Sequence, residues 1–291
     1  MIDNEDRKHI EKLIDNKKII DSKLLSSSFG INCFKITTSD KQDLITKFYK
    51  KKNNDFNAIV SEAKNLIFLN DLKLNFFPKV HRSNSHYLIM SFIKNNEIKP
   101  NKTEEDLLNA IISIHSNKDE KYGLNFDSQI GGIKQKNKRS DNWVDFFRDL
   151  RLGYVYELIN SSYPMDGSIN AKIELLLKNL GNFIPKNPRA SLLHGDLWEG
   201  NILFNFKSFS GFIDPGSFYG HNEMEIAYLR WFNPKFIDNN FLEKYQERIY
   251  IDSYYMKYEF IYQLYYSLLN VYLWDRSYID NVSELLKKLK L

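Results

Sequence analysis

Residues 192–204 read LLHGDLWEGNILF, and this stretch decides how the rest of the sequence is interpreted. It places Asp196 in a short polar loop between two apolar, strand-like runs. Asn201 follows five residues later, where the chain turns apolar again. Asp and Asn are common in turns, where their side chains satisfy backbone groups. The other interpretation is that both side chains take part in chemistry.

The chain that follows this loop predicts a β-hairpin. The segments NILFNF and FSGFID flank Lys207-Ser208, and a turn centred on that pair would place Asn201 opposite Asp214. An amide oxygen beside a carboxylate suits Mg²⁺, which usually takes one or two protein oxygens together with phosphates and water. Asp196 is then free to orient or deprotonate a hydroxyl group.

This spacing is typical of a kinase catalytic loop, HGDxxxxN, followed 13 residues later by an Asp on a paired strand. Such a site also needs groups that hold the nucleotide. Lys47 lies in the strand-like segment DLITKFY, and Glu62 lies in a helix predicted over 57–72. The preceding segment SSSFGINCF, with one glycine, offers backbone N–H groups and serine hydroxyls to phosphate. We expect the nucleotide-binding residues to be Lys47, Glu62, Ser28, Gly30, Met90 and Phe92.

The apolar spacing predicts an α+β fold with two lobes. The first part should contain a short helix over 5–15, a hairpin within 24–50, a helix with Ile59, Ala63, Leu66 and Ile67 on its apolar face, and strands in FFPKV and HYLIMSFI. We expect residues 1–93 to form a small, mainly antiparallel-sheet lobe that clamps the nucleotide. Residues 94–291 should form a larger helical lobe with the catalytic loop and the substrate site.

Helical patterns dominate the second part. Thr103 and Asp106 resemble a capping box ahead of LLNAIISIH. Further helices are expected over 141–161, 168–182, 222–233, 240–275 with a break, and 279–290. The loop 127–140 is expected to be either mobile or a functional lid.

Composition excludes several classes of protein. The 291 residues are 43% hydrophobic and 27% charged, and the net charge of +4 is spread along the chain, so nucleic-acid binding is not expected. A single cysteine, Cys33, rules out an intrachain disulfide and suits a reducing cytoplasm. The polar start MIDNEDRKHI does not form a secretory signal, and no apolar run reaches the roughly 18 residues of a membrane span. We expect a cytoplasmic monomer without a membrane partner.

The motifs together resemble the fructosamine kinase (ketosamine-3-kinase) family, a group similar to the aminoglycoside phosphotransferases, with a protein-kinase-like fold. HGDLWEGN at 194–201 and FIDPGSFYGHNEMEIA at 212–227 carry the resemblance. YGLNFDSQIGG, DNWVDFFRDLRL and YQLYYSLLNVYLW extend it over about residues 22–290. The loop SSSFG is poorer in glycine than in the family, and Glu225 stands where the family prefers Asp. Cys33 lies about three residues beyond the position of a redox-active cysteine in some relatives, so redox control is not implied.

The resemblance implies ATP-dependent phosphorylation of a sugar hydroxyl, at the 3-position, of ketosamines such as ribulosamine or fructosamine adducts of lysine or protein. This would be a deglycation repair activity. It implies Asp196 as the catalytic base, Asn201 and Asp214 as Mg²⁺ ligands, and Lys47 with Glu62 as the nucleotide clamp. An aminoglycoside or choline kinase-like activity and a non-catalytic pseudokinase are the alternatives. WEGN and IDPGSFYGH speak against the first, and the complete set of acids and Lys47 speaks against the second.

Residues near the loop predict the substrate and the regulation. Trp198, Tyr219, His221 and Glu223 are expected to bind substrate, the aromatic rings by stacking on the sugar or its amine and the acid by attracting the ammonium. Trp198 and Phe218 could instead be core residues. Gly195 replaces the Arg with which protein kinases bind a phosphorylated activation loop, and only eight residues separate Asp214 from Glu223. We therefore expect no switching by phosphorylation.

Overall fold

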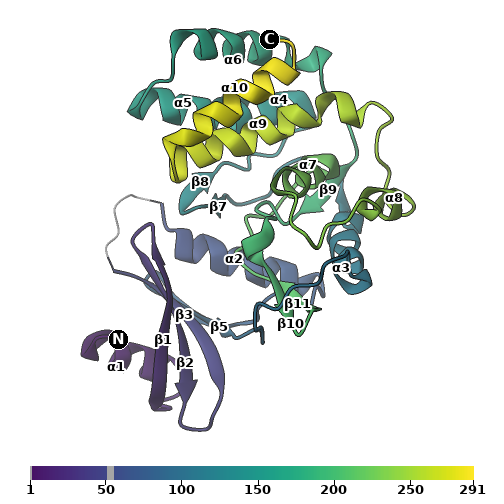
Figure 1. Cartoon of the computed structure of the whole chain (residues 1–291). Coiled ribbons are helices and arrows are strands. Elements are labelled where there is room, and N and C mark those ends of the chain that lie inside the picture. Colours follow the sequence, from purple (N-terminus) through teal and green to yellow (C-terminus); the bar gives the residue numbers. More distant parts are fainter. Residues whose placement is uncertain (1, 51–55) are drawn as a thin grey trace. The chain divides into compact units, whose positions relative to one another are not determined.

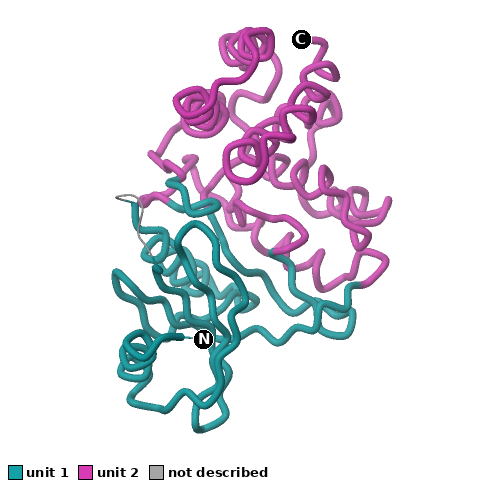
Figure 2. Tube along the Cα trace, turned by 60° about the vertical axis from the view of Figure 1, so that its left-hand side comes forward, with its two compact units in different colours: residues 1–99, 128–134, 201–216 teal, residues 100–127, 135–200, 217–291 magenta. Residues whose placement is uncertain are grey.

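The computed structural model describes residues 2–50 and 56–291 (Figure 1). The chain forms two compact units (Figure 2). The first comprises Met1–Lys99, Ser128–Lys134 and Asn201–Gly216, and the second comprises Pro100–Asp127, Gln135–Gly200 and Ser217–Leu291. The sequence indicated one boundary, after Ile93, whereas here two later segments also belong to the first unit. The catalytic-loop sequence passes from the second unit to the first after Gly200.

The first unit is built on a five-stranded sheet in which all neighbouring strands are antiparallel. Its spatial order is β1 (Ile19–Ser28), β2 (Ile31–Thr38), β3 (Asp43–Tyr49), β5 (Tyr87–Ser91) and β4 (Val80–Ser83). The sequence predicted a single hairpin within 24–50, so β1 was missed. Only Ile19 of β1 is buried, because β1 is an edge strand, and its sequence therefore lacks the apolar alternation that marks a half-buried strand.

Two helices lie on opposite faces of this sheet. Because side chains alternate along each strand, neighbouring residues of β3 point toward different helices. Phe48 on β3 belongs to the apolar cluster that includes Ile10 of α1 (Asn4–Leu13). Its neighbour Lys47 points the other way, toward α2 (Ala58–Asp71). The predicted helix over 57–72 is confirmed, and its predicted apolar positions are buried except Ile67, which is 45% exposed. Apolar residues outnumber the positions that one face of α2 can bury.

A second, two-stranded sheet of the first unit is the predicted hairpin, formed by β10 (Ile202–Asn205) and β11 (Ser208–Phe212). Its register differs from the prediction. The turn is Phe206-Lys207, whose φ angles of 49° and 69° are those of a type I′ turn. Asn201 is therefore level with Ile213, whose N–H donates to the Asn201 carbonyl at 3.1 Å, and Asp214 is the next residue.

The second unit contains a three-stranded sheet and most of the helices. Its sheet has the order β12 (Phe218–His221), β9 (Ala190–Leu193), β6 (Lys118–Asp119). The helices are α3 (Glu105–Ser116), α4 (Trp143–Phe147), α5 (Gly153–Ser162), α6 (Gly167–Asn179), α7 (Asn222–Phe232), α8 (Phe241–Gln246), α9 (Tyr255–Leu273) and α10 (Ile279–Lys288). The buried α9 packs against α5, α7 and α10 (Figure 1). Within the described residues, no helix is both long and apolar enough to cross a bilayer.

The helix predicted over 141–161 is interrupted by a π-helix, Arg148–Leu152, between α4 and α5. Arg151 in this segment is fully buried. It donates to the carbonyl of Lys136 and to the side-chain oxygen of Asn137, both at 2.6 Å, and its guanidinium lies 3.9 Å from the Phe218 ring centroid. The irregular segment thus places a buried cation against the start of β12.

One expectation for the second part of the chain is corrected. Thr103 does not cap α3, which starts after Glu104. Instead the Thr103 hydroxyl accepts a hydrogen bond from the Asp238 N–H at 3.1 Å, and this tertiary contact outweighs a local cap. The segment 127–140 contains a hairpin, β7 (Ser128–Ile130) with β8 (Ile133–Gln135), and all three residues of β7 are buried. Its role as a functional lid stays a prediction.

The turn between β10 and β11 predicts a stabilising double substitution, Phe206→Asn with Lys207→Gly. Both native residues have positive φ, which costs roughly 1–2 kcal/mol for a residue that carries a Cβ, while Asn-Gly is the preferred type I′ pair. We expect the thermal unfolding midpoint to rise by a few degrees, about 1 kcal/mol. Phe206→Ala is the control, because it removes the exposed ring and keeps the backbone strain. An equal rise with Phe206→Ala would mean that the turn geometry is not the cause.

Candidate active site

The first unit contains a cluster of one cation and two carboxylates. The Lys47 Nζ lies 2.7 Å from Glu62 Oε1 and 2.5 Å from Asp214 Oδ1. Lys47 and Glu62 are buried, whereas the Asp214 side chain is 40% exposed. Burial acts to lower the pKa of Lys47, but the charges of Asp214 and Glu62 outweigh it and raise the pKa, so the amine stays charged. The predicted pairing of Lys47 with Glu62 is thus present, and Asp214 joins it.

Asn201 and Asp214 lie at the open end of the β10–β11 hairpin. The hydrogen bond between Ile213 and Asn201 holds the two segments together, and the Phe212 N–H donates to the Phe76 carbonyl at 2.9 Å. Asp214 has a φ of 54°, a backbone conformation that non-glycine residues adopt at a cost and that clusters at functional sites. One carboxylate and one amide oxygen form a hard donor set that fits Mg²⁺.

The predicted phosphate loop is a tight turn between β1 and β2. Ser28 pairs with Ile31, and the two turn residues, Phe29 and Gly30, have φ angles of 51° and 77°. Ser28 and Gly30 therefore lie at the tip of a hairpin in a loop with little spare chain. Cys33 follows on β2, where burial raises the pKa of its thiol to about 11, so the thiolate that redox reactions need is scarce.

The two other predicted nucleotide residues come from the region of β5. Met90 is buried and pairs with Ile45 of β3. Phe92 follows β5, is half-buried, and has the Lys35 amine 4.5 Å from its ring centroid. Their contact with a nucleotide remains a prediction.

In the second unit, a buried carboxylate holds the start of the catalytic loop. Glu225 of α7 accepts hydrogen bonds from the N–H groups of His194, at 3.0 Å, and Gly195, at 2.7 Å. The His115 Nε2 of α3 lies 2.9 Å from the same side chain. Burial acts to raise the pKa of Glu225, but these contacts lower it overall, so the carboxylate stays ionised. The sequence singled out Glu225 only as a departure from the family.

Asp196 lies one residue beyond this point of attachment. Its N–H donates to the His194 Nδ1 at 3.2 Å, and its carboxylate shares a hydrogen bond with the hydroxyl of Tyr228. Burial and the Asp196 charge raise the pKa of Tyr228, so Tyr228 is the donor. The ring of Tyr228 stacks on Tyr266 of α9 at 3.6 Å between centroids. Tyr228 was not among the predicted site residues, although its spacing of three residues from Glu225 places both side chains on one face of α7.

Trp198 lies two residues beyond Asp196, and its backbone N–H donates to the Asp196 carbonyl at 3.2 Å. Its side chain is half-buried and its ring centroid lies 5.9 Å from that of Phe232, which in turn lies 5.2 Å from Tyr228. A Cβ on Gly200 would come within 2.4 Å of the indole, so the WEG sequence needs glycine there. Phe218, by contrast, is fully buried against Phe146 and is a core residue.

Three other predicted substrate residues do not gather around Asp196. His221 pairs with Ala190, at the end of β9 that is remote from Asp196, and Tyr219 is buried in mid-strand opposite Leu192. Burial lowers the pKa of His221 to about 3, so it is neutral. The sequence signal, a polar and aromatic run after Asp214, did not reveal that β12 carries these side chains away from the loop.

The prediction that Glu223 attracts a substrate ammonium is wrong. Glu223 is fully buried, and it accepts hydrogen bonds from the Asp252 N–H at 2.6 Å and from the Tyr258 hydroxyl at 2.5 Å. Burial raises its pKa to about 7. The carboxylate therefore joins α7 to the chain ahead of α9 and does not reach a ligand.

The comparisons with known proteins agree with the motifs. The sequence profile described as fructosamine kinase matches residues 5–291. A protein of Vibrio cholerae named a probable ketoamine kinase is 26% identical over 263 residues, covering 90% of this chain and 86% of that protein. The chloroplastic protein-ribulosamine 3-kinase of Arabidopsis thaliana is 27% identical over 212 residues, covering 70% and 64%.

The fold is also shared with a solved structure. A Thermobifida fusca protein whose crystal structure is described as that of a fructosamine-3-kinase superposes with a TM-score of 0.84 at 18% identity, and the match covers 98% of each chain. At this identity the likeness concerns the fold. The expected α+β, protein-kinase-like class, with a mainly antiparallel sheet first and helices after it, is confirmed.

The buried Glu225 predicts a large loss of stability on Glu225→Gln. An amide has one acceptor where the carboxylate has two, so at least one buried N–H donor loses its partner along with the charge. We expect the free energy of unfolding in urea to fall by roughly 3–5 kcal/mol. The control is Glu259→Gln, because its partner Arg230 is partly exposed and that pair should contribute less. Equal losses in the two variants would contradict the role given to Glu225.

Proposed function

This chain belongs to the fructosamine kinase family, and we propose that it transfers the γ-phosphoryl group of ATP to the 3-hydroxyl of a ketosamine. Ribulosamine and fructosamine adducts of lysine, free or in protein, are the proposed substrates, and removal of these adducts is the proposed purpose. One observation carries the proposal. The Lys47 amine of β3 pairs with Glu62 of α2, with Asp214 beside it, and a strand lysine paired with a helix glutamate is the arrangement by which kinases position nucleotide phosphates.

Each residue of the proposed site has its own role in phosphoryl transfer. Lys47 binds phosphate oxygens and Glu62 orients Lys47. Asn201 and Asp214 are the ligands for Mg²⁺, which when bound neutralises charge on the transferring phosphoryl group. Asp196 accepts the proton of the attacking hydroxyl, and only four residues of chain link it to Asn201. Tyr228 donates to Asp196 and so orients its carboxylate.

Trp198 is the proposed contact for the sugar or its amine. Its half-buried indole, supported by Phe232, follows Asp196 by two residues. A ketosamine carries a secondary ammonium, which an aromatic face attracts and which plain sugars lack. An aminoglycoside or choline kinase-like activity is the alternative, and the names of the relatives do not favour it. A cytoplasmic monomer remains our expectation from the sequence.

The proposed activity is tested by ATP consumption against ribulosamine- and fructosamine-lysine, aminoglycosides, choline and free sugars. We expect ketosamines to be used far better than the other compounds. Trp198→Ala should lower ketosamine turnover more than background ATP hydrolysis. Efficient use of an aminoglycoside or choline, with no use of any ketosamine, would refute the proposal.

The role of Asp196 predicts that Asp196→Asn lowers turnover by about 10² or more, the usual contribution of a positioned base. ATP affinity and the unfolding midpoint should change little, because Asp196 is only half-buried. Tyr228→Phe keeps the stacked ring and loses the hydroxyl, so we expect a smaller loss, of about tenfold. Near-normal turnover by Asp196→Asn would remove it from the catalytic residues.

The role of Asp214 predicts a change in metal requirement. Asp214→Asn should raise the Mg²⁺ concentration needed for half-maximal rate at least about tenfold, because the amide removes the charge that holds the cation. Lys47→Ala should raise the ATP requirement. The control is Asp43→Asn, an acid of the same strand as Lys47 that pairs with Lys35 instead. Unchanged Mg²⁺ and ATP titrations in the Asp214 and Lys47 variants would contradict the assignment.

A further inference from the structure

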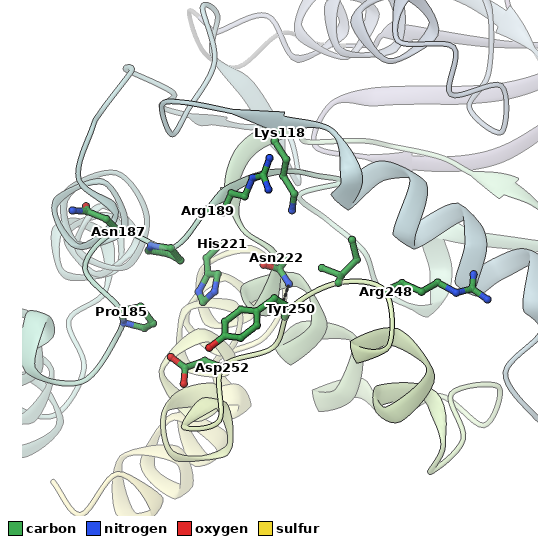
Figure 3. A pocket seen from close by; sticks show the side chains of 11 residues that line it. Lys118, Pro185, Asn187, Arg189, His221, Asn222, Arg248, Tyr250 and Asp252 are labelled. Carbon is green, nitrogen blue, oxygen red and sulfur yellow. Dashed lines mark hydrogen bonds between the residues drawn. The ribbon is translucent and has the colours of Figure 1, made fainter.

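A second pocket lies wholly within the second unit, at the end of β9 and β12 remote from Asp196 (Figure 3). Its walls come from Lys118 on β6, the segment 185–189 that leads into β9, the β12–α7 junction and the segment 248–252 that follows α8. Its volume of about 320 Å³ suits a small molecule. None of the residues proposed for phosphoryl transfer lines it.

Two cations lie on one side of this pocket. Figure 3 shows Lys118 and Arg189 next to each other. Lys118 is half-buried and its Nζ donates to the Ser191 hydroxyl at 2.5 Å. In the part of the chain that the structure describes, neither Lys118 nor Arg189 pairs with a carboxylate. Burial, together with the charge of Arg189, lowers the pKa of Lys118 to about 8.

The other polar groups leave this charge uncompensated. Arg248 points away from the two cations in Figure 3 and pairs with Glu105 at 2.7 Å. His221 is neutral. The one carboxylate of the lining, Asp252, lies on the opposite side of the pocket and accepts a hydrogen bond from the Tyr254 N–H at 2.8 Å. Two adjacent cations repel each other, and an anion bound beside both would offset that repulsion.

We propose that this pocket binds the oxyanion group of a small metabolite, a carboxylate or a phosphate, through Lys118 and Arg189. The guanidinium of Arg189 offers a planar pair of N–H donors and Lys118 offers a compact charge, the two modes by which proteins hold such groups. Asp252 disfavours a second anionic group on the far side. The ligand is therefore a molecule with a single anionic head, and its site is separate from that of phosphoryl transfer.

Calorimetric titration of the full chain tests the proposal. Sodium phosphate and sodium acetate are titrated separately at pH 7, with sodium chloride as the reference at equal ionic strength. Saturable binding of phosphate, of acetate or of both supports the proposal and identifies the anion class. Arg189→Gln and Lys118→Gln should each weaken binding about tenfold or more, the scale of a lost charge-assisted hydrogen bond.

Two control variants distinguish anion binding in this pocket from anion binding at other cations of the chain. Lys121→Gln removes an exposed lysine near Lys118 that pairs with Asp141, and it should leave binding unchanged. Lys47→Ala should also leave it unchanged, because Lys47 belongs to the proposed nucleotide site. If Lys118→Gln does not fold, the affinity measured for Arg189→Gln tests the proposal, because Arg189 is exposed and its substitution should not disturb the fold. Absence of saturable binding, or unchanged affinity in Arg189→Gln, would overturn the proposal.

Discussion

The site in the second unit depends on one buried carboxylate. Glu225 is fully enclosed by protein, and it remains ionised because two backbone N–H groups of the catalytic loop and the His115 ring surround it. A buried charge is costly unless every contact is in place, so this arrangement tolerates little displacement. It fixes α7 against the first residues of the loop. Tyr228, one turn further along α7, consequently faces Asp196.

The first unit also contains a buried charge that depends on its neighbours, and here the charge is a cation. Lys47 is a buried cation on a strand whose other face packs in an apolar core, and it is stabilised only because α2 and the β10–β11 hairpin each supply an acid. The two acids differ in exposure. Glu62 is enclosed and pairs with Lys47, whereas the side chain of Asp214 is 40% exposed.

Sequence reasoning predicted contacts that follow from a local motif. It failed where tertiary packing determines the direction in which a side chain or strand points. The pairing of Lys47 with Glu62 followed from one strand and the next helix, since both elements have clear periodicity. The register of the β10–β11 hairpin was wrong by one residue next to Asn201, because Phe206-Lys207 forms a type I′ turn without the Asn-Gly signature. The edge strand β1 was missed because almost nothing on it is buried.

The residues after Asp214 illustrate the same limit. His221 and Glu223 are close to the motif in sequence, yet an antiparallel pairing with β9 carries them to the far end of the sheet. A polar residue near a catalytic motif is exposed or buried according to the helix that covers it, and Tyr258 on α9 covers Glu223. No local pattern contains that information, since 35 residues separate the two side chains.

The segment HGDLWEGN is best understood as a set of mutually dependent contacts. His194 accepts from the Asp196 N–H, and Gly195 adopts a φ of 88° that lets the loop turn while its N–H reaches Glu225. Gly200 leaves room for the indole of Trp198. His194, Gly195 and Gly200 are therefore each tied to a neighbour in the loop or to Glu225. That mutual dependence explains why neighbouring residues of this loop, rather than scattered ones, carry much of the information about this site.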